Sequence, residues 1–97
     1  MFKKSFRKFD EVAQFLREER FQLYTLIVNK ITDCMITGKT TTLVAEFLIT
    51  DEGVTFKIEM KKEEWYESLH LALNYFEETE EYEKCSEIKK LIKDLYE

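Results

Sequence analysis

The sequence predicts one small α+β domain. An N-terminal helical segment (residues 1–38) precedes a central antiparallel β-hairpin (41–60) and a C-terminal antiparallel helical hairpin (62–96). Apolar and polar residues alternate in the middle of the chain, whereas apolar residues recur at helical spacing on either side. Ninety-seven residues, of which 44% are hydrophobic, suffice for one modest core. A single domain of mixed class therefore follows.

The segment before residue 38 is predicted to be helical. Its apolar residues recur every three or four positions, at Phe6, Phe9, Ala13 and Leu16 and then at Leu23, Ile27, Ile31 and Cys34. Gly38 follows where a helix C-cap glycine belongs. Several β-branched residues between positions 25 and 37 lower helix propensity, so a strand is the alternative there. The pattern leaves open whether residues 8–37 form one helix or two.

The first nine residues place Phe2, Phe6 and Phe9 among four basic side chains. We expect the start of a helix whose phenylalanines pack on the core, although such segments can also lie on anionic membranes or touch nucleic acid. The chain as a whole has a net charge of −5, a poor basis for contacting phosphates. No apolar run approaches the roughly 20 residues that span a bilayer. We therefore expect a cytoplasmic protein that binds neither nucleic acid nor membrane.

Two alternating stretches, around residues 43–50 and 54–60, predict the β-hairpin. Asp51-Glu52-Gly53 lies between them and supplies turn-forming residues, with glycine at the left-handed position. By strict alternation, Val44 and Leu48 fall on the face opposite Phe47. A strand that is apolar on both faces must be covered twice, by helices or by a partner.

The C-terminal region carries two apolar stripes, one through Trp65, Leu69, Ala72, Leu73 and Phe76 and one through Tyr82, Cys85, Ile88, Ile92 and Leu95. At about 100° per residue the stripes lie on opposite sides of one straight helix. A break near Glu77–Glu81 would let two helices fold back and bury both stripes.

No constellation typical of catalysis, metal binding or cofactor binding is found. Thr37-Gly38-Lys39-Thr40 is similar to the end of a phosphate-binding loop, but position 33 is Asp33 where that motif needs glycine. His70 is the only histidine, so a metal site would have to draw on it, the two cysteines and carboxylates, with no close ligand pair to nucleate it. Cys34 and Cys85 lie on apolar stripes, so we expect buried thiols. The sequence predicts a protein that is not an enzyme and carries no cofactor.

The stretch Tyr82-Glu83-Lys84-Cys85-Ser86-Glu87-Ile88-Lys89-Lys90-Leu91-Ile92 resembles the second helix of the UVR motif. That motif is a helical hairpin of nucleotide-excision-repair proteins and of some protease adaptors. Its aromatic–glutamate pair, its small pair and its two aliphatic positions are matched, whereas Lys89-Lys90 replaces its arginine–aspartate pair. The resemblance covers residues 69–95 and implies a hairpin that docks a similar hairpin or self-associates.

The leading hypothesis is a non-catalytic interaction or adaptor module that docks a protein, or a second copy of itself, through the helical hairpin or the β-hairpin face. The alternative is an acidic inhibitor that mimics nucleic acid, of the viral anti-defence kind, presenting Glu77–Glu83 to a basic channel. The predicted partner-binding residues are Val44, Leu48, Glu77, Glu78, Glu80, Glu81, Tyr82 and Lys89.

Overall fold

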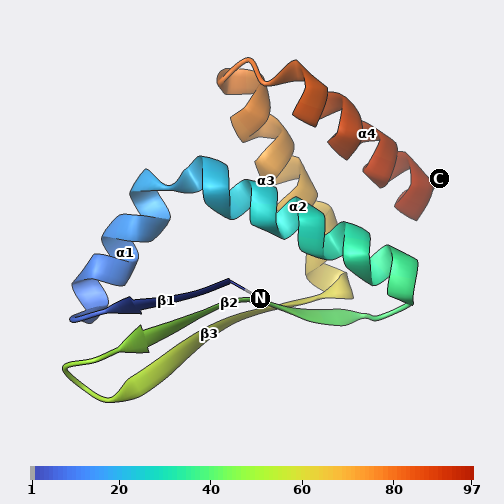
Figure 1. Cartoon of the computed structure of the whole chain (residues 1–97). Helices are drawn as coiled ribbons and strands as arrows, with labels where there is room; N and C mark the ends of the chain where they lie inside the picture. Colours follow the sequence, from blue (N-terminus) through green and yellow to red (C-terminus); the bar gives the residue numbers. More distant parts are fainter. Residues whose placement is uncertain (1) are drawn as a thin grey trace.

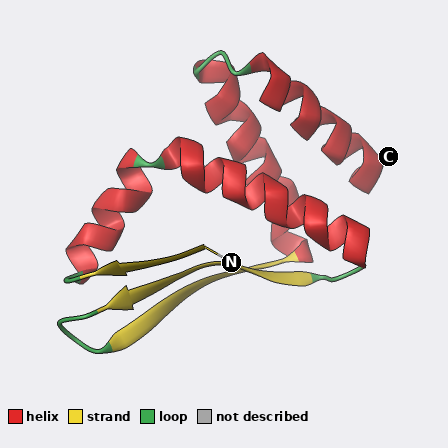
Figure 2. Ribbon diagram, viewed as in Figure 1, coloured by secondary structure: helices red, strands yellow, loops and turns green. Residues whose placement is uncertain are grey.

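The computed structural model describes residues 2–97 and has an α+β fold (Figure 1). Its helices lie on one side of a three-stranded sheet (Figure 2). The elements in chain order are β1 (Phe2–Phe6), α1 (Phe9–Glu18), α2 (Arg20–Thr37), β2 (Thr41–Ile49), β3 (Val54–Lys61), the 3₁₀ turn η1 (Lys62–Glu64), α3 (Trp65–Glu78) and α4 (Tyr82–Tyr96). No helix within this part of the chain has the length and apolarity needed to cross a bilayer.

The N-terminal residues form strand β1 rather than the start of a helix, so the prediction of a wholly helical segment 1–38 is wrong. β1 pairs in parallel with β2, with Phe2 beside Ala45 and Phe6 beside Ile49, and the sheet is therefore mixed. The four-residue spacing of Phe2 and Phe6 suggested a helix, but residues four apart share a face in a strand as well as in a helix. The connection through α1 and α2 supplies the long crossover that a parallel pair needs.

Residues 8–37 form two helices, which answers the question left open by the sequence. The break falls at Glu19, whose φ of −104° and ψ of 44° are not helical. The second helix ends as predicted at Gly38, which adopts a left-handed φ of 75°. Its backbone N–H donates to the carbonyl of Cys34, and the N–H of Lys39 donates to the same oxygen. The strand alternative for this region is wrong.

Strands β2 and β3 form the predicted antiparallel hairpin, and Gly53 in its turn has a φ of 63°. A β-bulge between Leu43 and Ala45 adds one residue to β2. Because of this extra residue, Val44 and Ala45 are both fully buried. The expectation that Val44 shares an outward face with Leu48 is therefore wrong, since strict alternation does not survive a bulge.

The helical C-terminal region is interrupted near Glu77–Glu81, as the two apolar stripes predicted. Helices α3 and α4 pack together on either side of a turn at residues 79–81 (Figure 1). Glu80 in this turn has a φ of 60°, uncommon for a residue other than glycine. Both stripes contribute to the core, through Trp65, Leu69, Phe76, Cys85 and Ile88. The same core takes Phe47 and Ile49 from β2 and Ile31 from α2, so helices and sheet form one unit.

Candidate interaction surfaces

A groove runs between α2 and α4, with a volume of about 390 Å³. Its apolar lining comes from both helices, with Val28, Met35 and Ile36 on α2 and Leu91 on α4. Ile36 is the most exposed large apolar side chain in the described part of the chain, at 79%. Ile36 adjoins the half-buried Met35 above the nearly buried Val28 and Leu91, and adjoining exposed apolar side chains are the kind of surface that a partner can cover.

The two rims of the groove differ in charge. The α2 rim carries the uncharged Asn29 and Thr32, whereas the α4 rim carries Glu87, Lys90 and Asp94. Residues 2–97 contain two ion pairs, Lys3–Glu46 and Arg7–Asp51, and neither involves this rim. Glu87 and Asp94 lie seven residues apart, so they are separated by two helical turns on one side of α4. The α4 rim therefore offers two carboxylates, about 10 Å apart along the helix, with Lys90 between them, so its net charge is negative.

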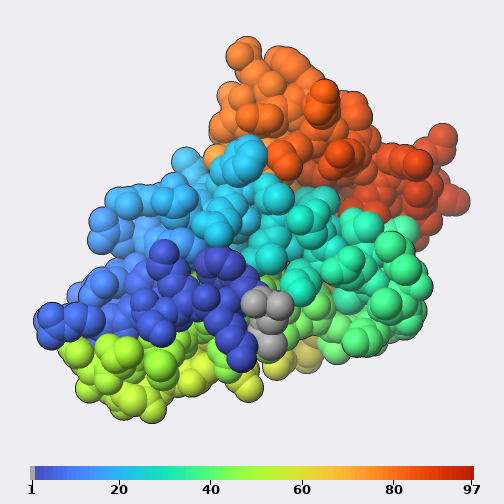
Figure 3. All heavy atoms as spheres, in the orientation of Figure 1, coloured from blue at the N-terminus to red at the C-terminus, as the bar shows by residue number. Residues whose placement is uncertain are grey.

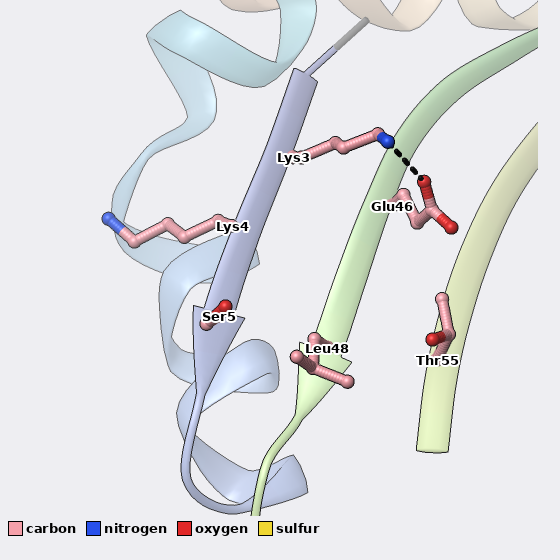
Figure 4. Close-up of a pocket in the computed structure, with 6 residues that line it drawn as sticks. All are labelled: Lys3, Lys4, Ser5, Glu46, Leu48 and Thr55. Atoms are coloured by element: carbon pink, nitrogen blue, oxygen red, sulfur yellow. Dashed lines mark ion pairs between the residues drawn. The ribbon is translucent and has the colours of Figure 1, made fainter. Parts of the chain in front are cut away.

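The face of the sheet turned away from the helices forms a shallow depression lined by Lys3, Ser5, Glu46, Leu48 and Thr55 (Figure 4). Lys3 and Glu46 form an ion pair of 3.6 Å across its upper end, while Lys4 points to the other side of the sheet. The predicted partner-binding residue Leu48 lies in this depression and is 41% exposed. Val44, predicted beside it, lies in the core.

The edge of strand β3 is a further candidate surface, because β3 is an outer strand of the sheet. Its first four residues are exposed, and Val54 and Phe56 retain 48% and 39% of their accessible surface. Phe9 at the start of α1 packs edge-to-face on Phe56 with 5.5 Å between the ring centroids. The turn end of the hairpin, yellow-green in Figure 3, lies at the opposite end of the molecule from the red α4.

The predicted acidic residues surround the turn between α3 and α4 and are all exposed. They are Glu77, Glu78, Glu80 and Glu81, and Tyr82 beside them is 64% exposed. Glu81 is the N-cap residue of α4 and Glu83 lies in its first turn. Carboxylates at these positions offset the partial positive charge of the helix N-terminus. Lys89 is also exposed, but it and Tyr82 lie outside the groove lining. The acidic-inhibitor hypothesis stays a prediction.

The residues weighed for catalysis are placed apart from the groove lining. Cys34 and Cys85 are buried and free, as predicted, and the Cys34 thiol lies 3.8 Å from the carbonyl of Thr41. The His70 ring packs on Tyr66 at 4.4 Å, and Tyr66 packs edge-to-face on Tyr96. Partial burial, together with the nearby Tyr66, raises the pKa of Tyr96. Within residues 2–97 no three metal-ligating side chains form a cluster.

Sequence reasoning missed the groove and the β3 edge as surfaces. One signal for the groove was present, because Ile36 is five residues beyond Ile31 and therefore about 140° around α2 from the buried stripe. A large aliphatic side chain placed off the core stripe is the pattern of a second apolar contact. The position of α4 across from it depends on the turn at residues 79–81, which the spacing of apolar residues does not describe.

No family model, curated protein or solved structure matches this chain. The resemblance of residues 69–95 to the UVR motif therefore stays a hypothesis.

Proposed function

We propose that this chain is a non-catalytic protein-interaction module that binds an amphipathic helix of a partner protein in the groove between α2 and α4. The observation that carries the proposal is Ile36, which is 79% exposed at the wall of an apolar groove. A helix is the fitting occupant because the groove lies between two helices, as in recognition modes where an apolar helix face lies in such a groove.

The rims specify the chemistry of that helix. Its apolar stripe would contact mainly Ile36 and Met35, above a floor formed by Val28 and Leu91, each of which is 8% exposed. On the α4 side, basic residues seven positions apart would face Glu87 and Asp94, because both spacings correspond to two turns. On the α2 side, Asn29 and Thr32 require only polar or small neighbours. The UVR-like features of residues 69–95 motivate the same kind of docking, since α4 is the second helix of that hairpin.

The test uses two designed helical peptides that share one leucine stripe. One peptide carries lysine at two positions seven residues apart, and the other carries glutamate at the same positions. Fluorescence anisotropy should give a dissociation constant at least about tenfold lower for the lysine peptide. Absence of binding by both peptides, or equal affinity for both, would contradict the proposal.

Two protein variants locate the binding. Ile36→Glu places a charge in the groove and should weaken the lysine peptide about tenfold or more. Leu71→Glu is the matched control, because Leu71 is also an exposed apolar residue, at 50%, and lies outside the groove lining on α3. Glu87→Lys combined with Asp94→Lys should reverse the preference between the peptides. An unchanged preference would place binding on another surface.

A further inference from the structure

The free edge of β3 is the feature that leads beyond helix binding. β3 ends the strand order β1-β2-β3, so its outer side pairs with no other strand among residues 2–97. Unpaired backbone N–H and C=O groups along an outer strand are a template for another strand.

The hydrogen bonding of the hairpin sets which residues face the open edge. Residues of an antiparallel pair alternate between hydrogen-bonded and non-hydrogen-bonded positions. At the end of the hairpin the N–H of Lys62 donates to the carbonyl of Thr40 at 2.8 Å, which makes that pair a hydrogen-bonded one. Even-numbered residues of β3 therefore bond to β2. Thr55, Lys57, Glu59 and Lys61 turn their N–H and C=O groups outward.

The outward residues are self-complementary in charge. If a second copy adds its own β3 antiparallel, with a two-fold axis at Ile58, then Lys57 lies opposite Glu59 of the second copy, and Glu59 lies opposite its Lys57. Thr55 lies opposite Lys61 in the same register. All these pairs fall at positions whose N–H and C=O groups are free, so each pair can exchange two hydrogen bonds.

Neighbouring registers are disfavoured. Moving the axis to Lys57 puts Lys57 opposite itself, and moving it to Glu59 puts Glu59 opposite itself. Like charges directly opposite each other destabilise a strand pair. An odd shift would place the apolar inner face of one copy beside the polar outer face of the other. An axis at Met60 also pairs Glu59 with Lys61, but β3 ends at Lys61, so only residues 59–61 of the two strands would then overlap. The axis at Ile58 pairs opposite charges, matches the faces and pairs residues 55–61 of both strands.

The same register also places the more exposed half of each β3 strand beside the buried half of the other. Val54 and Phe56, in the first half of β3, remain 48% and 39% exposed, whereas Met60 in the second half is buried. Antiparallel pairing about Ile58 brings Phe56 of each copy opposite Met60 of the other. The uncovered half of one strand then lies beside the covered half of its mate, where it gains an apolar neighbour.

We propose that two copies of this chain dimerise by antiparallel pairing of β3 with β3 about Ile58, which joins two three-stranded sheets into one of six strands. The proposal is independent of helix binding in the groove, because it uses another surface.

The charge pairs give the first test. Glu59→Lys puts lysine opposite Lys57 of the second copy at two symmetric positions, and Lys57→Glu puts glutamate opposite Glu59. Each variant alone should raise the dimer dissociation constant about tenfold or more in sedimentation velocity, because two attractive pairs become repulsive. A mixture of the two variants restores opposite charges in a heterodimer and should recover the wild-type constant. A wild-type chain that stays monomeric, or a mixture that stays monomeric, would overturn the proposal.

Folding is checked by circular dichroism. Glu59→Lys is the primary variant, because Glu59 faces the uncharged Leu43 within its own hairpin, whereas Lys57 faces Glu46. Loss of dimer in a folded Glu59→Lys chain is the expected result. An unchanged dissociation constant in that folded variant would contradict the register.

A cross-link tests the axis directly. Cysteine at Ile58 would meet its own symmetry mate at a non-hydrogen-bonded position, where Cα atoms lie about 4.5 Å apart, within the range of a disulfide. Ile58→Cys should therefore oxidise to a covalent dimer. Thr55→Cys is the control. Residue 55 lies opposite residue 61 of the second copy, so the two cysteines at position 55 would be six residues apart along the strands, about 20 Å. The native Cys34 and Cys85 are buried. Equal cross-linking of both variants would overturn the proposal, and Ile36→Glu should leave the Ile58→Cys dimer unchanged.

Discussion

The two edges of the sheet, β1 and β3, differ in length and in charge pattern. β1 has five residues, and its only charges are Lys3 and Lys4. A second β1 strand laid against it would bring lysines together without any acid to balance them, which is a known way of protecting an edge. β3 has eight residues and alternates the signs of Lys57, Glu59 and Lys61 along its outward side. The order of charges along an edge, more than their number, decides whether a second strand is repelled or accepted.

The two edges are also held differently. β1 is anchored by aromatic packing, since the rings of Phe2 and Phe6 lie 6.2 and 5.6 Å from that of the buried Phe47. Phe15 of α1 completes this cluster, and the Lys4 ammonium lies 5.0 Å from the centre of its ring. β3 is held by its long register on β2 and contributes mostly exposed side chains. Side-chain packing secures the first edge and main-chain pairing secures the second.

The largest effect is expected from Phe47→Ala, which removes the centre of the aromatic cluster. A loss of about 3–5 kcal/mol in the free energy of unfolding is expected from urea denaturation, because the ring is fully buried. Phe56→Ala, on the half-exposed side of β3, is the matched control and should lose about 1–2 kcal/mol. Similar losses for the two variants would show that the buried aromatic cluster stabilises the fold no more than the exposed half of β3 does.

Proline substitutions distinguish the inward and outward backbone groups of β3. Phe56→Pro removes an N–H that bonds to β2, whereas Lys57→Pro removes one that faces the open edge. Relative to alanine at the same position, Phe56→Pro should cost about 1–3 kcal/mol more than Lys57→Pro. Lys57→Pro should abolish the dimer in sedimentation velocity while the chain stays folded. The reverse order of unfolding free energies would contradict the alternation.

A smaller effect is expected at the turn that connects β2 to β3. Gly53→Ala should lower the free energy of unfolding by about 1–2 kcal/mol, because Gly53 has a φ of 63°. An added Cβ would meet no atom within 4 Å, so the cost is conformational rather than steric. Gly53→Asn should lose less, since asparagine tolerates this conformation better. Equal losses for the two variants would point to another cause.

The smallest effect is expected at the ion pair between β1 and β2. Lys3→Ala removes a contact of 3.6 Å whose lysine is 66% exposed. The loss should be at most about 0.5 kcal/mol and should shrink further at high salt, because exposed ion pairs contribute little. Phe6→Ala, on the same strand, should cost several times more if packing secures this edge. A larger loss for Lys3→Ala than for Phe6→Ala would assign that role to charge.

The hairpins were the most predictable parts of this fold. The period-two alternation around Gly53 and the two out-of-phase stripes of the C-terminal region each encode their element locally, so β2–β3 and the break between α3 and α4 could be placed. β1 could not be placed, because Phe2 and Phe6 suit either period. The outward position of Leu48 followed from alternation, whereas the burial of Val44 depends on the bulge.

Sequence alone determined the α+β class, the β-hairpin, the capping glycine of α2 and the break between the last two helices. Each of these follows from the spacing of residues that are close together in the chain. Tertiary structure decided the parallel addition of β1, the groove between α2 and α4 and the free edge of β3. Each of these depends on segments far apart in the chain coming together or failing to do so. Local periodicity describes which face of an element is apolar, but it does not describe what that face or edge will meet.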